Sequence, residues 1–185
     1  MGMRFVVSLT DRDLRFFREA LKKSRNAIRH ADESEIIEAV QDVILQIKRE
    51  EPLPDFVAVR VPELESMMLM LQDDEWALPK DERERLLATF IYFADPEDIL
   101  PDHIPVIGYL DDVIIIELVV REMHHVRVAY NDFCRFRDVL KRVKQGNIGD
   151  ADYRKQIAQK RRSLHQRMKR RLAKDRKEKK STALW

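Results

Sequence analysis

Four aspartates and one histidine gather in a short segment in the middle of the chain. They are Asp98, Asp102, His103, Asp111 and Asp112. Carboxylate oxygens and an imidazole nitrogen can bind a divalent cation, so these side chains would form a metal site if they converged. Aspartates also accept hydrogen bonds from backbone N–H groups in turns and at the amino ends of helices. We favour turn and capping roles for these residues, and the metal site stays an alternative.

No complete catalytic signature accompanies these residues. Glu122 and His125 have the Glu-Xaa-Xaa-His spacing that di-iron carboxylate bundles use on two helices, but the sequence has no second copy. It also has no glycine-rich phosphate loop, no paired-cysteine zinc pattern and no nucleophile elbow. The sequence therefore identifies no catalytic residue, no cofactor and no small-molecule substrate, and it favours a non-enzymatic protein.

The aspartate-rich segment also contains the residues that most constrain or free a backbone. Its prolines are Pro96, Pro101 and Pro105, and Gly108 is the only glycine between residues 3 and 145. Each proline fixes its own φ angle and biases the preceding residue towards extended geometry, whereas glycine can adopt positive φ. Apolar helical patterns precede and follow the segment, so we expect a rigid corner that packs two helices together.

The residues of this corner resemble the signature of the YkvA-like bacterial domain of unknown function. Members of that family have a Pro-Xaa-Asp-Leu-Ile-Pro-Asp-Xaa-Ile-Pro-Xaa-Xaa-Gly-Xaa-Xaa-Asp-Asp loop between two hydrophobic helices. The matching positions are Pro96, Asp98, Pro101, Asp102, Ile104, Pro105, Gly108, Asp111 and Asp112. His103 departs from the aromatic or aliphatic residue that is usual there. The resemblance extends over about residues 86–120 and implies a helical hairpin, but it implies no reaction, substrate or cofactor.

Composition and periodicity predict an all-α protein. Charged residues make up 37% of the chain and only four residues are glycine, whereas sheet proteins need more turn glycine. We expect a compact helical bundle around the central hydrophobic hairpin, with one long helix at about 110–144. Thr10 is suited to cap the first helix, and Asp32 or Ser34 is suited to cap the second.

The chain divides by charge near Gly146 and Gly149, which are expected to end the long helix. Residues 151–185 contain 14 lysines and arginines against three acids, a net charge of +11. The remaining residues contain 21 bases and 30 acids, a net charge of −9. We therefore expect an acidic helical body at 1–146 and a basic tail at 147–185, helical from Ala151 to about Lys179.

The basic tail is the main indication of a partner. Its densest basic groups are Lys160, Arg161, Arg162, Lys169, Arg170 and Arg171. They suit docking to a protein, which includes the acidic body or a second copy, or binding to nucleic acid or to an anionic membrane surface. Membrane contact would be peripheral at most, because no segment has the roughly 18 uncharged apolar residues that a spanning helix needs.

One cysteine, Cys134, excludes an internal disulfide and fits a reducing compartment. We expect its thiol to be buried in a helix, because it lies beside Phe133 and Phe136. Taken together, these features predict a cytoplasmic interaction module without enzymatic activity. Nucleic-acid or anionic-surface binding through the tail and a metal site in residues 98–112 are the alternatives.

Overall fold

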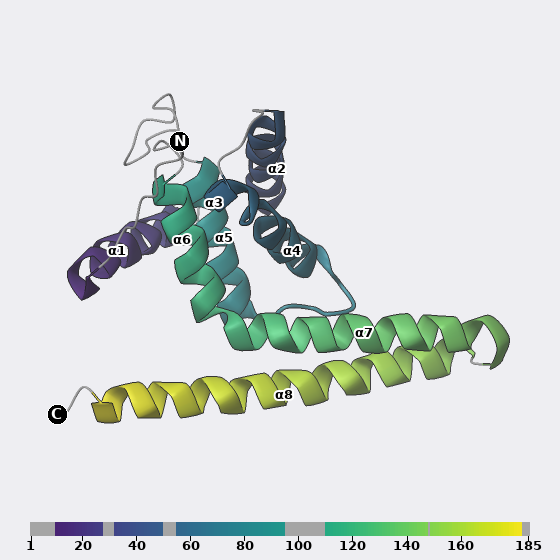
Figure 1. The fold of residues 1–185 in the computed structure, drawn as a ribbon. Coiled ribbons are helices and arrows are strands. Elements are labelled where there is room, and N and C mark those ends of the chain that lie inside the picture. The colour runs from purple at the N-terminus through teal and green to yellow at the C-terminus, as the bar shows by residue number, and fades with distance from the viewer. Residues whose placement is uncertain (1–9, 28–31, 50–54, 95–109, 148, 183–185) are drawn as a thin grey trace. The chain divides into compact units, whose positions relative to one another are not determined.

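The computed structural model describes residues 10–27, 32–49, 55–94, 110–147 and 149–182 (Figure 1). Every secondary-structure element in these ranges is a helix, so the predicted all-α fold class is confirmed. In chain order, the helices are α1 (Asp11–Ala27), α2 (Glu33–Arg49), α3 (Asp55–Ala58), α4 (Val61–Gln72), α5 (Lys80–Ala94), α6 (Leu110–Glu122), α7 (His124–Asn147) and α8 (Asp150–Thr182).

Contacts group the chain into two compact units. Unit 1 comprises Met1–Val61 and Glu84–Glu117, and unit 2 comprises Pro62–Arg83 and Leu118–Trp185. Helices α5 and α6 therefore contribute residues to both units. The predicted division into an acidic body at 1–146 and a basic tail at 147–185 stays a prediction. By its contacts, α8 belongs to the same unit as α7.

The first two helices of unit 1 begin at side-chain caps. The backbone N–H of Thr10 donates to Asp13 Oδ2 at 2.8 Å, and the Asp13 N–H donates to Thr10 Oγ1 at 3.4 Å. This reciprocal pair satisfies backbone donors that a helix leaves unpaired at its start. In α2, Asp32 Oδ1 accepts hydrogen bonds from the N–H and hydroxyl groups of Ser34 at 2.9 and 2.7 Å. Of the two predicted caps of α2, Asp32 and Ser34, the structure has Asp32.

The core of unit 1 follows helical periodicity. The buried stripe of α2 consists of Ile36, Val40, Ile44 and Ile47, whereas the neighbouring Val43 is only partly buried. In the second segment of unit 1, Glu84–Glu117, the side chains of Leu86, Phe90 and Ile115 are completely buried. An ion pair at 2.7 Å between Arg60 Nη2 and Glu117 Oε2 lies within the same unit.

The long helix expected at about 110–144 is found as α6 and α7, which are separated by a turn at Met123. Backbone hydrogen bonds continue across the turn, from Met123 N–H to the Val119 carbonyl and from Arg127 N–H to the Met123 carbonyl. No proline or glycine lies near Met123, so the interruption has no local helix-breaking cause. The Met123 side chain is completely buried, which indicates that packing places the turn there.

Helices α7 and α8 of unit 2 form an antiparallel hairpin, in which the two helices lie side by side (Figure 1). The apolar stripe of α8 is buried at Tyr153, Ile157, Leu164 and Met168, and Leu172 is partly buried. On α7, Val126, Tyr130, Phe133 and Leu140 are buried and Phe136 is partly buried, but Val139 is 60% exposed.

The methionine-rich run of α4 also belongs to the core of unit 2. Met67, Met68 and Met70 are buried together with Leu71, while Leu69 between them is 64% exposed. The run therefore fills the core of unit 2, a role that the flexible methionine side chain suits.

Replacing a buried aromatic side chain in unit 1 should destabilise the protein much more than replacing an exposed one. Phe90→Ala should lower the free energy of unfolding by about 3–5 kcal/mol, because it leaves a cavity in the core. Phe16→Ala in the same unit removes a ring that is 56% exposed, and it should change stability by less than about 1 kcal/mol. Urea unfolding followed by circular dichroism measures both values, and equal losses would contradict the core described here.

Candidate functional site

The structure places only part of the predicted metal site. Asp98, Asp102 and His103 lie outside the described residues, as do the motif residues Pro96, Pro101, Ile104, Pro105 and Gly108. The backbone of Asp111 and Asp112 belongs to α6, and their side chains lie outside the described part of the structure. Within the described ranges, no group of three or more His, Cys, Asp or Glu side chains could hold a metal ion. The site at 98–112 stays a prediction.

The six predicted basic residues of α8 divide into packed and exposed ones. Lys160 Nζ lies 5.0 Å from the centre of the Phe136 ring on α7, and Arg161 Nη1 donates to the Glu75 carbonyl at 3.2 Å. Arg162, Lys169, Arg170 and Arg171 are exposed. Two of the six therefore help to hold α8 in unit 2, and four face solvent.

The set of exposed cations on α8 extends beyond the residues that the sequence singled out. It comprises Arg154, Lys155, Arg162, Lys169, Arg170 and Arg171. Residues 153–174 include no acid, so Arg162, Lys169 and Arg170 have no acid within four residues along the helix. None of the six forms an ion pair within the described residues of unit 2. We call these six residues the basic face, and it is the candidate functional site.

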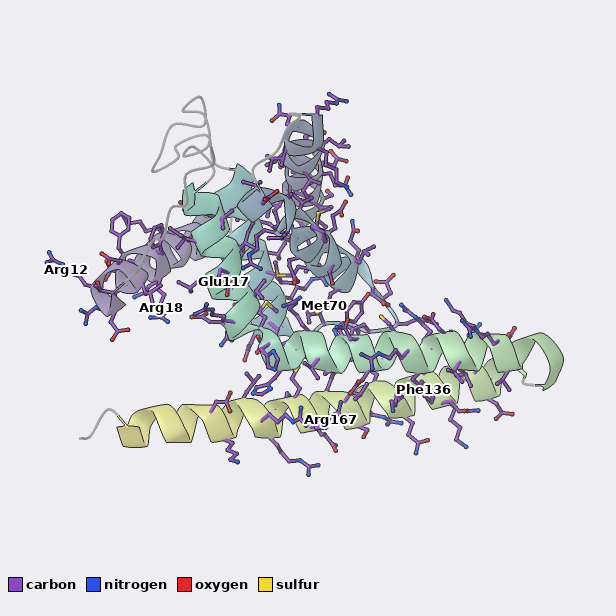
Figure 2. All side chains as sticks on the ribbon, viewed as in Figure 1. Arg12, Arg18, Met70, Glu117, Phe136 and Arg167 are labelled. Atoms are coloured by element: carbon purple, nitrogen blue, oxygen red, sulfur yellow. The ribbon has the colours of Figure 1, made fainter. Side chains whose placement is uncertain are left out.

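Pairs of charged side chains fix the register of α8 on α7 and so orient the basic face. Arg167 of α8 pairs with Asp132 of α7. Towards the other end of the hairpin, His125 Nε2 lies 2.7 Å from Asp175 Oδ2. Figure 2 shows Arg167 on α8 and Phe136 on α7, the ring that Lys160 covers. Because each pair joins α7 to α8, the opposite side of α8 is left to the basic face.

A tryptophan in the segment between α4 and α5 packs against both helices of the hairpin. Trp76 is completely buried. Its ring centre lies 5.3 Å from that of Phe133 and 5.6 Å from that of Tyr130 on α7. It lies 4.4 Å from the centre of His165 on α8, in an edge-to-face arrangement. The indole therefore ties the connecting segment to α7 and α8 at once.

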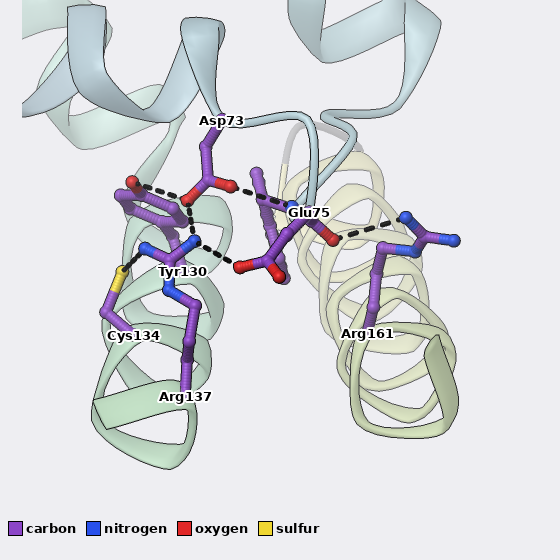
Figure 3. A network of polar contacts seen from close by, with 7 residues as sticks. Asp73, Glu75, Tyr130, Cys134, Arg137 and Arg161 are labelled. Atoms are coloured by element: carbon purple, nitrogen blue, oxygen red, sulfur yellow. Dashed lines mark hydrogen bonds and ion pairs between the residues drawn. The ribbon is translucent and has the colours of Figure 1, made fainter. Parts of the chain in front are cut away.

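Polar contacts around Trp76 hold the same segment in place (Figure 3). Asp73 Oδ1 accepts a hydrogen bond from the backbone N–H of Trp76 at 3.0 Å. Asp73 Oδ2 accepts from Arg137 Nη1 at 2.6 Å and from the Tyr130 hydroxyl at 3.1 Å. Arg137 also lies 3.3 Å from Glu75 Oε2, so one guanidinium from α7 binds two acids of the segment.

The surroundings of this network disfavour nucleophilic chemistry at Cys134. Arg137 Nη2 donates to Cys134 Sγ at 3.6 Å, and the thiol is half-buried, which is less than the burial we expected. Burial raises the pKa of Cys134, although Tyr130 and Arg137 oppose the shift. Because the thiolate is the nucleophile, a raised pKa makes the group less reactive.

Asp73, Glu75, Arg137 and His165 were missed by sequence reasoning. One signal was present, since an aspartate three residues before tryptophan can accept a turn hydrogen bond from its backbone. The partners on α7 and α8 lie more than fifty residues away in sequence, and no local pattern identifies them.

Comparisons with known proteins identify one region of the chain. Residues 85–118 match the model of a family described as a protein of unknown function (DUF1232), which is about a fifth of the chain. The match supports an uncharacterised domain family in the region where the sequence predicts the hairpin. No curated protein and no solved structure matches the chain significantly. None of the helices in the described ranges is long and apolar enough to cross a membrane.

Removing Asp73 should strongly destabilise unit 2. Its side chain is 9% exposed and that of Arg137 is 17% exposed, so Asp73→Ala leaves a largely buried cation without its nearest acid. We expect the free energy of unfolding to fall by about 2–4 kcal/mol. The neighbouring Asp74 is exposed, and Asp74→Ala should have little effect. Thermal and urea unfolding of the two variants measure the difference, and equal losses would contradict the network.

His165 should make stability depend on pH. The pKa of His165 is lowered from 6.5 to about 4, mainly by burial against Trp76 and in part by the nearby cations Arg161 and Lys169. The unfolded chain therefore binds this proton at a higher pH than the folded chain does. The contribution of His165 is fully present above pH 6.5 and is lost as the pH falls from about 6.5 to about 4.

Urea unfolding between pH 4 and 7 tests this dependence. In His165→Gln, the free energy of unfolding should decrease less between pH 6.5 and 4 than it does in the unchanged protein. His124→Gln, at an exposed histidine, serves as the control and should keep the original pH dependence. An unchanged pH profile in His165→Gln would show that the imidazole is not held neutral by its surroundings.

Proposed function

We propose that the protein is a non-enzymatic interaction module that binds a polyanionic macromolecule through the basic face of α8. The observation that carries the proposal is the division of α8 into two sides. The apolar side is buried within unit 2, and the surface that remains presents six exposed cations, of which Lys155, Arg162 and Lys169 lie in one row. No acid lies between residues 153 and 174.

The electrostatics of the basic face support a polyanionic partner. Like charges on neighbouring turns repel one another, so a run of exposed cations without acids weakens the isolated helix. A polyanion removes that repulsion and releases its own condensed counterions when cations bind it, which favours association. The exposed cations repel one another in the free protein, and a bound polyanion relieves this repulsion. This is the behaviour expected of a surface that binds a polyanion.

The other parts of the proposal come from the sequence and the family match. The sequence contains no complete catalytic, nucleotide-binding or zinc-binding signature, which favours an interaction role over an enzymatic one. The family matched at residues 85–118 has no described function, so it favours no activity. A single cysteine fits the reducing conditions of the cytoplasm, where we propose that the protein acts.

Retention on immobilised heparin, a generic polyanion, tests the proposal. The unchanged protein should bind at low salt and elute as salt rises, because salt weakens phosphate-type and sulfate-type contacts alike. The variant Arg162→Glu/Lys169→Glu/Arg170→Glu reverses three charges of the basic face. Its affinity should fall at least about tenfold, and it should elute at much lower salt.

A matched control separates the basic face from net charge. Lys22, Lys23 and Arg49 are exposed cations of unit 1, and their replacement by glutamate changes the net charge by the same amount. This control should elute close to the unchanged protein. Two results would contradict the proposal: no retention of the unchanged protein at low salt, or equal losses of retention in the two triple variants.

A further inference from the structure

Glutamines alternate with cations along the middle of the basic face. The residues are Lys155, Gln159, Arg162, Gln166 and Lys169, and the side chain of each is exposed. Steps of four, three, four and three residues place them in one row along the helix, because an α-helix has 3.6 residues per turn. We call this row the cation–amide ladder.

The ladder has a regular length scale. Successive cations are seven residues apart, so each lies about 10.5 Å from the next along the helix axis, and the three span about 21 Å. The side of α8 that carries Tyr153, Ile157, Leu164 and Met168 is buried, which leaves the ladder facing outward. Contacts with α7 hold α8 on its other side, so the ladder is presented on a supported helix.

We propose that the polyanion bound by the basic face is a nucleic-acid duplex. This inference rests on the proposed function and names its partner. Lysine and arginine bind phosphate oxygens, and glutamine amides bond both to the sugar–phosphate backbone and to base edges. The three cations span about 21 Å along one side of α8, so they can contact phosphates that follow one another along a duplex. The amides between them can bond to the sugar–phosphate backbone or to base edges.

The exposed groups distinguish a duplex from an anionic membrane. A helix that binds a membrane surface inserts an apolar side below the lipid headgroups. In α8 the apolar side is buried within unit 2, and the ladder contains amides where inserted apolar side chains would be needed. The surface therefore favours a partner that offers both anionic and hydrogen-bonding groups.

The aromatic residues of α8 distinguish a duplex from a single strand. Proteins that bind single strands without sequence selectivity stack the bases on exposed aromatic rings. In the described part of α8, the aromatic side chain Tyr153 is buried, and His165 packs its ring against Trp76. The ladder thus offers no stacking platform, and base pairs can stay intact.

Fluorescence anisotropy with the full chain and labelled duplexes of about 20 base pairs, two helical turns, tests the inference. Two unrelated sequences should bind with similar affinity, because most contacts are to phosphates. In the variant Lys155→Gln/Arg162→Gln/Lys169→Gln, the slope of log K against log salt should become shallower by about 2.7, which is about 0.9 for each lost phosphate contact. Lys22→Gln/Lys23→Gln/Arg49→Gln should keep the original slope.

The glutamines provide a second readout. Gln159→Ala/Gln166→Ala should weaken duplex binding by about five- to twenty-fold, as expected for the loss of two neutral hydrogen-bonding groups. Its salt slope should not change, because neither side chain releases a counterion. Circular dichroism checks that each variant is folded, and Arg162→Gln replaces the triple variant if that one unfolds, with an expected slope change of about 0.9.

The possible partners give different results in parallel measurements. Duplex binding with the expected slopes supports the inference. Retention on heparin without duplex binding overturns it but leaves the proposed polyanion binding intact. Tighter binding to phosphatidylserine vesicles, to polyglutamate or to a single strand than to the duplex overturns it in the same way. If the protein binds neither heparin nor a duplex, both proposals are contradicted.

Discussion

The complete burial of Trp76 is the constraint on which the arrangement of unit 2 depends. Asp73 and Glu75 are close to Trp76 in the chain, so its packing places them in the same part of unit 2. Charged groups that lose contact with solvent need partners nearby. Arg137 binds both acids, and Arg161 donates to the Glu75 carbonyl. Ala77 has a φ of 47°, a left-handed conformation that is unfavourable for a residue with a Cβ atom. Packing of the indole therefore sustains both a strained backbone and a set of half-buried charges.

This constraint also decides which cations of α8 remain for a partner. Lys160 and Arg161 lie on the side of α8 that faces Phe136 and Glu75, where they stabilise the hairpin. Both side chains therefore already interact with groups of unit 2 before any partner binds. Arg162 and Lys169, on the other side, keep theirs. A run of basic residues in a sequence is thus divided by helical geometry into structural and available groups.

Local patterns predicted much of the fold, and long-range pairing explains what they missed. The caps at Thr10 and Asp32 and the buried stripe of α8 depend on residues a few positions apart, so periodicity and residue type were sufficient. The pairing of Asp73 with Arg137 joins residues 64 positions apart, and the turn at Met123 has no helix-breaking residue near it. The two sides of the basic helix could have been separated from sequence, because Lys160 and Arg161 follow Ile157 at helical spacing.

The basic helix cannot be treated as a removable tail. Its buried residues Tyr153, Ile157, Leu164 and Met168 form part of the core of unit 2, so deleting residues 147–185 would expose the apolar side of α7 and the ring of Trp76. Loss of binding after such a deletion would not separate a missing surface from an unfolded unit. Substitutions confined to exposed side chains of α8 keep the core and change only the charge. The region matched by the family model, residues 85–118, lies almost entirely in unit 1, so the basic face needs an explanation of its own.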